Sequence, residues 1–474
     1  MLPRLDARAI RRLTWLLLLA SVGLRLYGLD RLPGINGDEA WLAVQVQHLL
    51  RGDPYTLRTP THMFINPLLV GTEAGLLSVL PPSGWILRLP TALWGLVGLG
   101  LFGWLTWRLL ADRTLALLAV ALLACAPLAV AYGHVSWDPS FLFVVAPLVW
   151  LPALRLADAR ANRLDIGLLV LGIAACLWVH LTAVLMLAML ALGAWRLHSP
   201  SRQVTWGLLV LGVLALLALA VIGRLGTSTL SILVERPLIF LSRPVLLLQL
   251  FAVPGLLLTG GRAFGYFAGM PETWPVWTAA VLATLGLGGL AWRLRNAPLA
   301  SDRLLAWSWL LLPLPWWIAA GVLVPQSPSR ERYVVWLLVP SVLLLVRGLR
   351  AAPGLLLGVA TVSAVLSATW LYAVDNQLWP DTTHRAFRTA AVEPKVAIAA
   401  RLRQLAVPGQ PLRIAVADWW LEHPLRYLLP PDAQIGIGLE NPQFSLVWSD
   451  QAGKTFPETL YDRHDRPILS LVRP

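Results

Sequence analysis

Long apolar runs separated by short polar turns dominate residues 1–374 of the chain. A helix that crosses a membrane needs roughly 20 apolar residues, and about 11 stretches approach that length. The first covers residues 13–27, and the others lie near 88–110, 114–131, 139–156, 164–178, 181–197, 203–223, 274–294, 303–324, 332–350 and 353–373. The pattern predicts an all-α polytopic transmembrane bundle of about 11 helices, within a range of about 11–13.

The pattern changes after Tyr372, where charges and prolines return and the long apolar runs stop. Alternation of apolar and polar residues predicts short strands here, and one segment has a helical period. The predicted strands are Arg413–Trp420, Gln434–Leu439 and Phe444–Ser449, and the predicted helix is Glu393–Leu405. We therefore expect residues 375–474 to form a small α/β domain after the membrane domain of residues 1–374.

Basic residues in alternate turns predict the orientation of the helices. Cytoplasmic turns carry an excess of Arg and Lys. With the N-terminus placed inside, the inner turns hold Arg108/Arg113, Arg155/Arg160/Arg163, Arg196/Arg202, Arg293/Arg295/Arg303 and Arg347/Arg350. The N-terminus is thus expected in the cytoplasm and the C-terminal domain outside, in a cell inner or plasma membrane.

Two outside segments, residues 30–87 and 224–273, are much longer than the other outside turns. Each contains a semi-apolar stretch that is too short or too interrupted to span a membrane. We expect Asn66–Leu80 and Val245–Leu258 to form helices that lie along the membrane surface.

Composition supports a membrane protein and excludes a soluble one. Hydrophobic residues make up 57% of the chain and charged residues only 13%, whereas soluble proteins average about 25% charged residues. The net charge of +13 comes mainly from arginines that stand singly between apolar runs. This placement indicates membrane topology rather than nucleic-acid binding.

Acidic residues occur in two of the outside turns. Asp38 and Glu39 follow an Asn-Gly turn after the first membrane helix, and Asp138 precedes Pro139 in the short turn 132–138. Their structural interpretation is helix capping and a favourable contact with the helix dipole. Their functional interpretation is general-base catalysis by a carboxylate at the membrane edge.

Several cationic residues lie in segments predicted to be outside, although Arg and Lys are expected mainly in cytoplasmic turns. Snorkelling to lipid headgroups is one explanation, and binding of a phosphate at the outer surface is the other. The residues we select for phosphate binding are Arg58, His62, Arg243, Arg262, Arg330 and Arg332.

No metal-binding spacing of the HxxxH or HExxH type is present among the outer-side histidines. We therefore expect that no cofactor is required. The alternative is a divalent metal ion bound by these histidines and the nearby carboxylates. Trp419 and Trp420 in the outside domain have two interpretations, stacking against a sugar or packing in a core.

Five short motifs follow one another along the chain: Asp38-Glu39, Pro67-Leu68, Ile86-Leu87-Arg88-Leu89-Pro90, Asp138, and Arg332-Tyr333 with Pro340. In this order they resemble motifs of the GT-C superfamily of integral-membrane glycosyltransferases. Within it, the chain is most similar to the branch with protein O-mannosyltransferases and the lipid A aminoarabinose transferase. The resemblance covers residues 1–150 and about 325–350. One departure is Asn66, which directly precedes Pro67 where family members often have a basic residue or His.

The resemblance implies an inverting glycosyltransferase whose donor is a sugar on a polyprenyl phosphate. Asp38 would accept the proton of an acceptor hydroxyl, while Glu39 and Asp138 would orient the sugars. The outside cations would stabilise the lipid phosphate that leaves, and the segment 224–273 would close over the donor. The partners implied are the lipid donor, membrane lipid and an acceptor glycan, lipid or protein, with no nucleic acid.

Two other functions remain open at this stage. A transporter or flippase for a lipid-linked sugar would show repeat symmetry and charges in the middle of the membrane, and neither is evident here. An oligosaccharide ligase or polymerase would use the same kind of donor.

Overall fold

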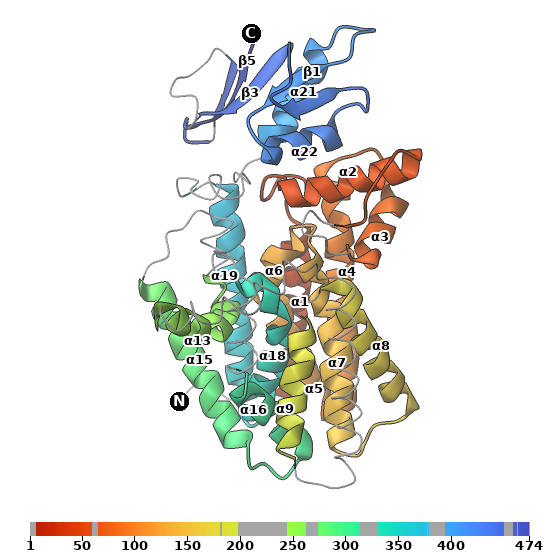
Figure 1. Cartoon of the computed structure of the whole chain (residues 1–474). Helices are drawn as coiled ribbons and strands as arrows, with labels where there is room; N and C mark the ends of the chain where they lie inside the picture. Colours follow the sequence, from red (N-terminus) through yellow and green to blue (C-terminus); the bar gives the residue numbers. More distant parts are fainter. Residues whose placement is uncertain are drawn as a thin grey trace.

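A bundle of long helices and a C-terminal sheet stacked on one end of it form the two parts of the protein (Figure 1). Two shorter helices, α2 (Gly37–Arg51) and α3 (Pro67–Leu77), lie between them. The computed structural model describes residues 6–58, 65–180, 183–197, 244–261, 274–312, 330–376, 378, 394–449, 458–461 and 463–473.

The bundle consists of helices that are rich in apolar residues. They are α1 (Ala7–Leu26), α4 (Gly84–Leu110), α5 (Arg113–Cys125), α6 (Pro127–Gly133), η1 (Asp138–Phe141), α7 (Leu142–Ala157), α8 (Arg163–Val179), α9 (Val184–Trp195), α13 (Pro244–Thr259), α15 (Trp274–Leu294), α16 (Ala300–Leu310), η3 (Arg330–Leu337), α18 (Leu338–Gly348) and α19 (Pro353–Asp375). Within the described residues, four segments are long and apolar enough to cross a membrane: Gly84–Leu110, Asp138–Ala157, Trp274–Leu294 and Pro353–Asp375.

Most of the predicted helices form, and the differences have local causes. The run 114–131 divides into α5 and α6 because Pro127 begins a new helix after the extended Ala126. Helices form at both positions where surface helices were expected, as α3 and α13. The predicted helix 203–223 and most of the second half of 303–324 lie outside the described residues.

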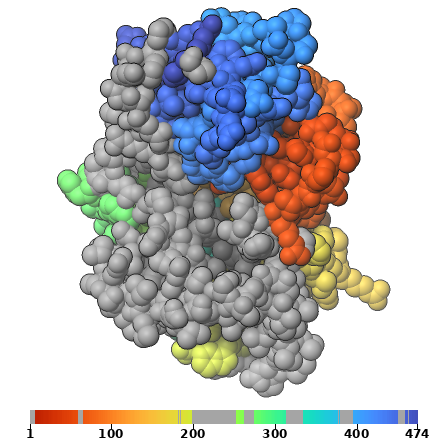
Figure 2. Space-filling view, turned by 45° about the horizontal axis from the view of Figure 1, so that its top comes forward, coloured from red at the N-terminus to blue at the C-terminus, as the bar shows by residue number. Residues whose placement is uncertain are grey.

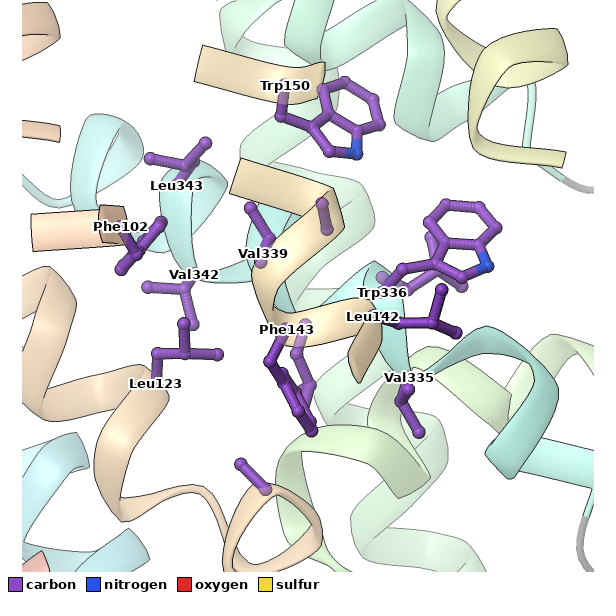
Figure 3. Close-up of a cluster of buried hydrophobic side chains, with 14 of the residues drawn as sticks. Phe102, Leu123, Leu142, Phe143, Trp150, Val335, Trp336, Val339, Val342 and Leu343 are labelled. Carbon is purple, nitrogen blue, oxygen red and sulfur yellow. The ribbon is translucent and has the colours of Figure 1, made fainter. Parts of the chain in front are cut away.

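The core of the bundle is apolar on every side, because its central helices contact other helices all around. Phe102 of α4, Leu123 of α5, Trp150 of α7 and Leu343 of α18 are all fully or almost fully buried. Figure 3 shows these side chains gathered around α7 and α18. Their packing fixes α4 and α7, the helices that begin beside the turns that carry Asp38 and Asp138.

Arginines of the turns predicted to be cytoplasmic form ion pairs. Asp165 at the start of α8 is fully buried and contacts Arg108 at 3.0 Å and Arg155 at 3.1 Å. Arg347 contacts Asp302 at 3.0 Å. These turns are therefore held together by ion pairs, at the end of the bundle away from the sheet.

The C-terminal sheet unit, residues 394–473, has five strands in the order β2-β1-β3-β5-β4. The strands β1, β2 and β3 are parallel neighbours, whereas β3, β5 and β4 are antiparallel. Its elements are α21 (Pro394–Leu405), β1 (Arg413–Val416), α22 (Trp419–Leu428), β2 (Gln434–Ile437), β3 (Phe444–Trp448), β4 (Glu458–Tyr461) and β5 (Pro467–Val472).

The predicted strand Arg413–Trp420 is too long by four residues. β1 ends at Val416, and Asp418 then caps α22 by accepting a hydrogen bond from the backbone N–H of Leu421 at 3.3 Å. The other two predicted strands and the helix Glu393–Leu405 form within about two residues of their expected bounds.

The sheet unit and the first long loop share one hydrophobic core. Leu421 and Leu425 of α22 pack with Ile35, Ala40 and Leu87 in a single buried cluster. Figure 2 shows the sheet unit, in blue, directly beside the first long loop, in red and orange. The loop is therefore part of the joint between the bundle and the sheet unit.

Polar contacts fix this joint at three places. The Tyr427 hydroxyl donates to the carbonyl of Ser83 at 3.1 Å and accepts from its N–H at 3.2 Å. The buried Lys395 ammonium donates to the carbonyl of Ile35 at 2.6 Å. Asp375, at the end of α19, accepts hydrogen bonds from residues of both parts, namely Tyr27, Arg31 and Arg463.

Replacing the Tyr427 hydroxyl tests this joint. Tyr427→Phe leaves both backbone groups of Ser83 without that partner, so we expect the opening free energy of α22 to fall by about 1–3 kcal/mol. Hydrogen exchange of the α22 amides measures it. The exposed Tyr461 provides the control, Tyr461→Phe, which should leave α22 protection unchanged. Equal protection in Tyr427→Phe and wild type would contradict the assigned role.

Candidate active site

The helix α2 begins with a reciprocal cap. The side chain of Asn36 accepts a hydrogen bond from the backbone N–H of Asp38 at 2.8 Å, and Glu39 accepts one from the backbone N–H of Asn36 at 2.7 Å. This arrangement satisfies backbone donors that the first turn of a helix otherwise leaves without partners. The helix α2 therefore begins at Gly37, and Asn36 rather than Asp38 holds the capping position.

Glu39 is fully buried and pairs with Arg88 of α4, which is also fully buried. Arg88 donates to one carboxylate oxygen at 2.7 Å and to the other at 3.2 Å. The backbone N–H groups of Asn36 and Ser136 supply one further bond to each oxygen, at 2.7 and 3.0 Å. Each oxygen of Glu39 therefore accepts two hydrogen bonds.

The remaining donors of Arg88 hold the loop between α1 and α2. They reach the carbonyl of Leu29 at 3.3 Å and the carbonyl of Gly34 at 3.1 Å. A buried ion pair is favourable only when extra hydrogen bonds offset the loss of water around both charges. In this site the extra hydrogen bonds offset that loss. The ion pair also joins four segments at one point: α2, α4, the loop 29–34 and the turn at Ser136.

Asp38 differs from its neighbours because it is half-buried, whereas Asn36, Gly37 and Glu39 are buried. Trp420 of the sheet unit packs over Gly37, where the Cβ of an alanine would lie 2.7 Å from the ring atom Cε3. Asp38 thus lies at the edge of a fixed structure, beside the joint between the bundle and the sheet unit.

Asp138 lies in the same turn as Ser136, two residues after the N–H that contacts Glu39. Its carboxylate accepts a hydrogen bond from the backbone N–H of Asn66 at 3.3 Å, and its side chain is half-buried. It does not cap the helix that follows, since Trp137 holds the capping position without a side-chain bond. The structure therefore brings the turns of Asp38, Glu39 and Asp138 together.

Of the residues selected for phosphate binding, only Arg58 has a described side chain. It is exposed and follows Thr56, whose N–H contacts Gln45 near the middle of α2. Five of the selected residues lie outside the described side chains: His62, Arg243, Arg262, Arg330 and Arg332. For Arg330 and Arg332 the structure gives the backbone alone, in η3.

Arg25 is a buried cation near the site that the sequence reasoning did not select. Its guanidinium donates to the carbonyl of Ala124 at 2.6 Å and joins the ends of α1 and α5. It also lines a small pocket together with Thr91 of α4 and Ser140 of η1. The signal was present in the sequence, since Arg25 interrupts an apolar run.

Glu73 is a second residue that the sequence reasoning missed. It lies in the apolar helix α3, is fully buried, and neither of its oxygens has a hydrogen-bond partner among the described residues. Burial, and then the nearby charge of Glu39, raise the pKa of Glu73 well above its ordinary value. The folded protein therefore favours the neutral acid at this position.

The described residues contain no group of three or more His, Cys, Asp or Glu side chains that could hold a metal ion. The carboxylates of the site instead contact backbone N–H groups and one guanidinium. Such a set of contacts fits carboxylates that are held in place by the protein itself.

Breaking the buried ion pair should be costly. Arg88→Met leaves Glu39 buried without its charge partner, and we expect the free energy of unfolding to fall by about 3–5 kcal/mol. Adding Glu39→Gln, which keeps an oxygen for the cap but removes the charge, should restore part of this loss. Thermal or denaturant unfolding measures both variants.

The exposed pair of Arg51 and Asp53 is the matched control. Arg51→Met should change the free energy of unfolding by less than about 1 kcal/mol. An Arg88→Met variant as stable as Arg51→Met would show that the buried pair does not organise the site.

Glu73 should make stability depend on pH. Below pH 4.5, the ordinary value, the carboxyl is protonated in both the folded and the unfolded states. As the pH rises further, only the unfolded state releases the proton, so wild-type stability falls. Glu73→Gln removes this dependence, and we expect it to gain stability over wild type between pH 5 and about pH 8.

Thermal unfolding across this pH range measures the difference, and Glu440→Gln, at an exposed carboxylate, is the control. A constant difference between Glu73→Gln and wild type from pH 5 to about pH 8 would be incompatible with a raised pKa of Glu73.

Comparison with known proteins shows the fold. No protein-family model matches the chain, and no curated protein sequence matches it. The apo crystal structure of ArnT from Cupriavidus metallidurans superposes with a TM-score of 0.50 and 16% identity, covering 96% of this chain and 97% of that chain. The structure of ArnT from Cupriavidus metallidurans bound to undecaprenyl phosphate gives a TM-score of 0.46, with the same identity and coverage.

ArnT is a lipid A aminoarabinose transferase of the GT-C class. The apolar helices and the shared fold indicate a multi-pass membrane protein. The predicted resemblance is confirmed at the level of the fold, because the chain has the ArnT-like arrangement of a membrane helix bundle with a small C-terminal sheet.

Proposed function

We propose that the protein is an inverting glycosyltransferase that moves a sugar from a polyprenyl-phosphate donor to an acceptor hydroxyl at the outer face of the membrane. The observation that carries the proposal is the position of Asp38. It is a half-buried carboxylate on the first turn of α2, and the residues on either side of it are buried. The ArnT-like fold supports the same class of enzyme.

Asp38 is placed to act as a general base. The oxygen of an acceptor hydroxyl attacks the anomeric carbon of the donor sugar, and Asp38 accepts the hydroxyl proton as this bond forms. The bond between the anomeric carbon and the phosphate oxygen breaks, and the polyprenyl phosphate leaves with its electron pair. Because attack and departure occur on opposite faces of the sugar, the configuration inverts.

Glu39 has a different role in this proposal from the one the resemblance implied. Both of its oxygens already accept two hydrogen bonds, and the side chain is fully buried. We therefore assign Glu39 and Arg88 to positioning the loop that carries Asp38. The half-buried Asp138 is the carboxylate that we assign to orienting a substrate hydroxyl.

The leaving group carries its own phosphate and needs stabilisation of charge rather than protonation. Arginine supplies this stabilisation without a metal, and the outer arginines selected from the sequence are the proposed source. The N-terminus would then lie in the cytoplasm and the sheet unit outside. Acceptors consistent with this chemistry are a glycan, a lipid or a protein.

The test of the proposed function is transfer of labelled sugar by the protein in lipid nanodiscs. Incubation with radiolabelled polyprenyl-phosphate sugars and a membrane extract should label one acceptor fraction. Asp38→Asn should lower the rate by about 100-fold or more, because general-base catalysis contributes about 10²–10⁴-fold, while thermal unfolding stays near wild type.

Asp53→Asn is the matched control, since Asp53 lies just after α2 and is exposed, with Arg51 as its partner. Its transfer rate should equal that of wild type. Normal turnover by Asp38→Asn would remove Asp38 as the base, and absence of transfer by the wild-type protein from every donor would refute the proposed function.

A further inference from the structure

The first turn of α22 lies directly against the start of α2 (Figure 1). The Cβ of an alanine at position 37 would lie 2.7 Å from Cε3 of Trp420 and 3.3 Å from its Cα. Only a residue without a side chain allows this contact. Trp420 is therefore in contact with the residue that precedes Asp38, and Trp419 is its neighbour in the chain.

Three aromatic side chains form one cluster at this turn. The rings of Trp419 and Trp420 have centroids 5.4 Å apart, and those of Trp419 and His423 are 4.9 Å apart, both edge to face. All three side chains are half-buried. Trp448, by contrast, is fully buried and donates its indole N–H to Asp418.

The cluster carries no net charge of its own. Burial, and then the positive charge of Arg426, lower the pKa of His423 to about 4, so its imidazole is neutral near pH 7. Arg426 itself pairs with Glu422 at 2.8 Å and donates to the carbonyl of Ile435. A neutral aromatic surface of this kind suits the apolar face of a sugar ring better than a phosphate.

We propose that Trp419 and Trp420 form the stacking wall of a sugar subsite beside Asp38, so that the sheet unit supplies part of the active site. The C–H groups on one face of a sugar ring pack against the electron-rich face of an indole. This inference rests on the proposed function. The sugar ring is either that of the donor or that of an acceptor glycan.

The contact over Gly37 makes this wall part of the fixed structure. The shared core and the bonds of Tyr427 and Lys395 hold α22 to the loop before any substrate arrives. A sugar ring bound there would be oriented relative to Asp38 without a further change of the protein, which favours a productive geometry.

The test is steady-state transfer by the full chain in nanodiscs, with the polyprenyl-phosphate sugar that gives activity. Trp419→Ala should raise the KM of the sugar-bearing substrate about tenfold while kcat stays within about threefold. Trp419→Phe, which keeps an aromatic face, should recover most of this loss. Trp419→Leu, which removes the aromatic face but keeps a large apolar side chain, provides a second variant with little risk to folding and should raise the same KM.

Tyr461→Ala is the matched control, because Tyr461 is an exposed aromatic residue of β4, at the opposite edge of the sheet from β2, which α22 contacts. Its KM values should equal those of wild type. A higher KM for the donor alone assigns the wall to the donor sugar, and a higher KM for the acceptor alone assigns it to the acceptor. Unchanged KM values in Trp419→Ala and Trp419→Leu would overturn the inference.

A direct binding measurement distinguishes a failure of the subsite inference from a failure of the proposed function. Saturation-transfer NMR with methyl mannoside and methyl glucoside is performed on the wild-type protein and on Trp419→Ala in nanodiscs. A signal that is lost in Trp419→Ala but kept in Tyr461→Ala supports the subsite even if no transfer is found. Equal signals in all three proteins, or none in any, would overturn it.

Discussion

The buried ion pair between Glu39 and Arg88 is the contact on which the rest of the site depends. Two charges removed from water are favourable only when their hydrogen-bonding capacity is filled, and here each Glu39 oxygen accepts two bonds. The partners come from the α2 cap, α4 and the turn at Ser136. A single buried carboxylate therefore holds the first long loop in its position on the bundle.

The sheet unit completes this arrangement from the other side. Lys395 binds the carbonyl of Ile35, Tyr427 binds both backbone groups of Ser83, and Trp420 covers Gly37. Asp38 is thus half-accessible on a turn whose surroundings are held by packing and hydrogen bonds. A carboxylate held in this way can contact a substrate without the entropy loss of ordering its own loop.

Structural features that depend on the local sequence pattern were predicted correctly. Features that depend on contacts between residues far apart in the sequence were missed. The helix Trp274–Leu294 forms as predicted, because a long apolar run with polar ends specifies its own length. The helix α22 was missed, since Pro424 and the adjacent tryptophans resemble a strand and loop. The pairing of Glu39 with Arg88 joins residues 49 positions apart, and no spacing rule identifies such a partner.

We propose that substrate chemistry takes place at Asp38, between the bundle and the sheet unit. A structure of the protein in lipid nanodiscs with a bound polyprenyl-phosphate sugar tests it most directly. We expect the sugar beside the Asp38 carboxylate and beneath α22, with the phosphate toward the bundle. A sugar bound at the opposite end of the bundle, near Asp165, would contradict it.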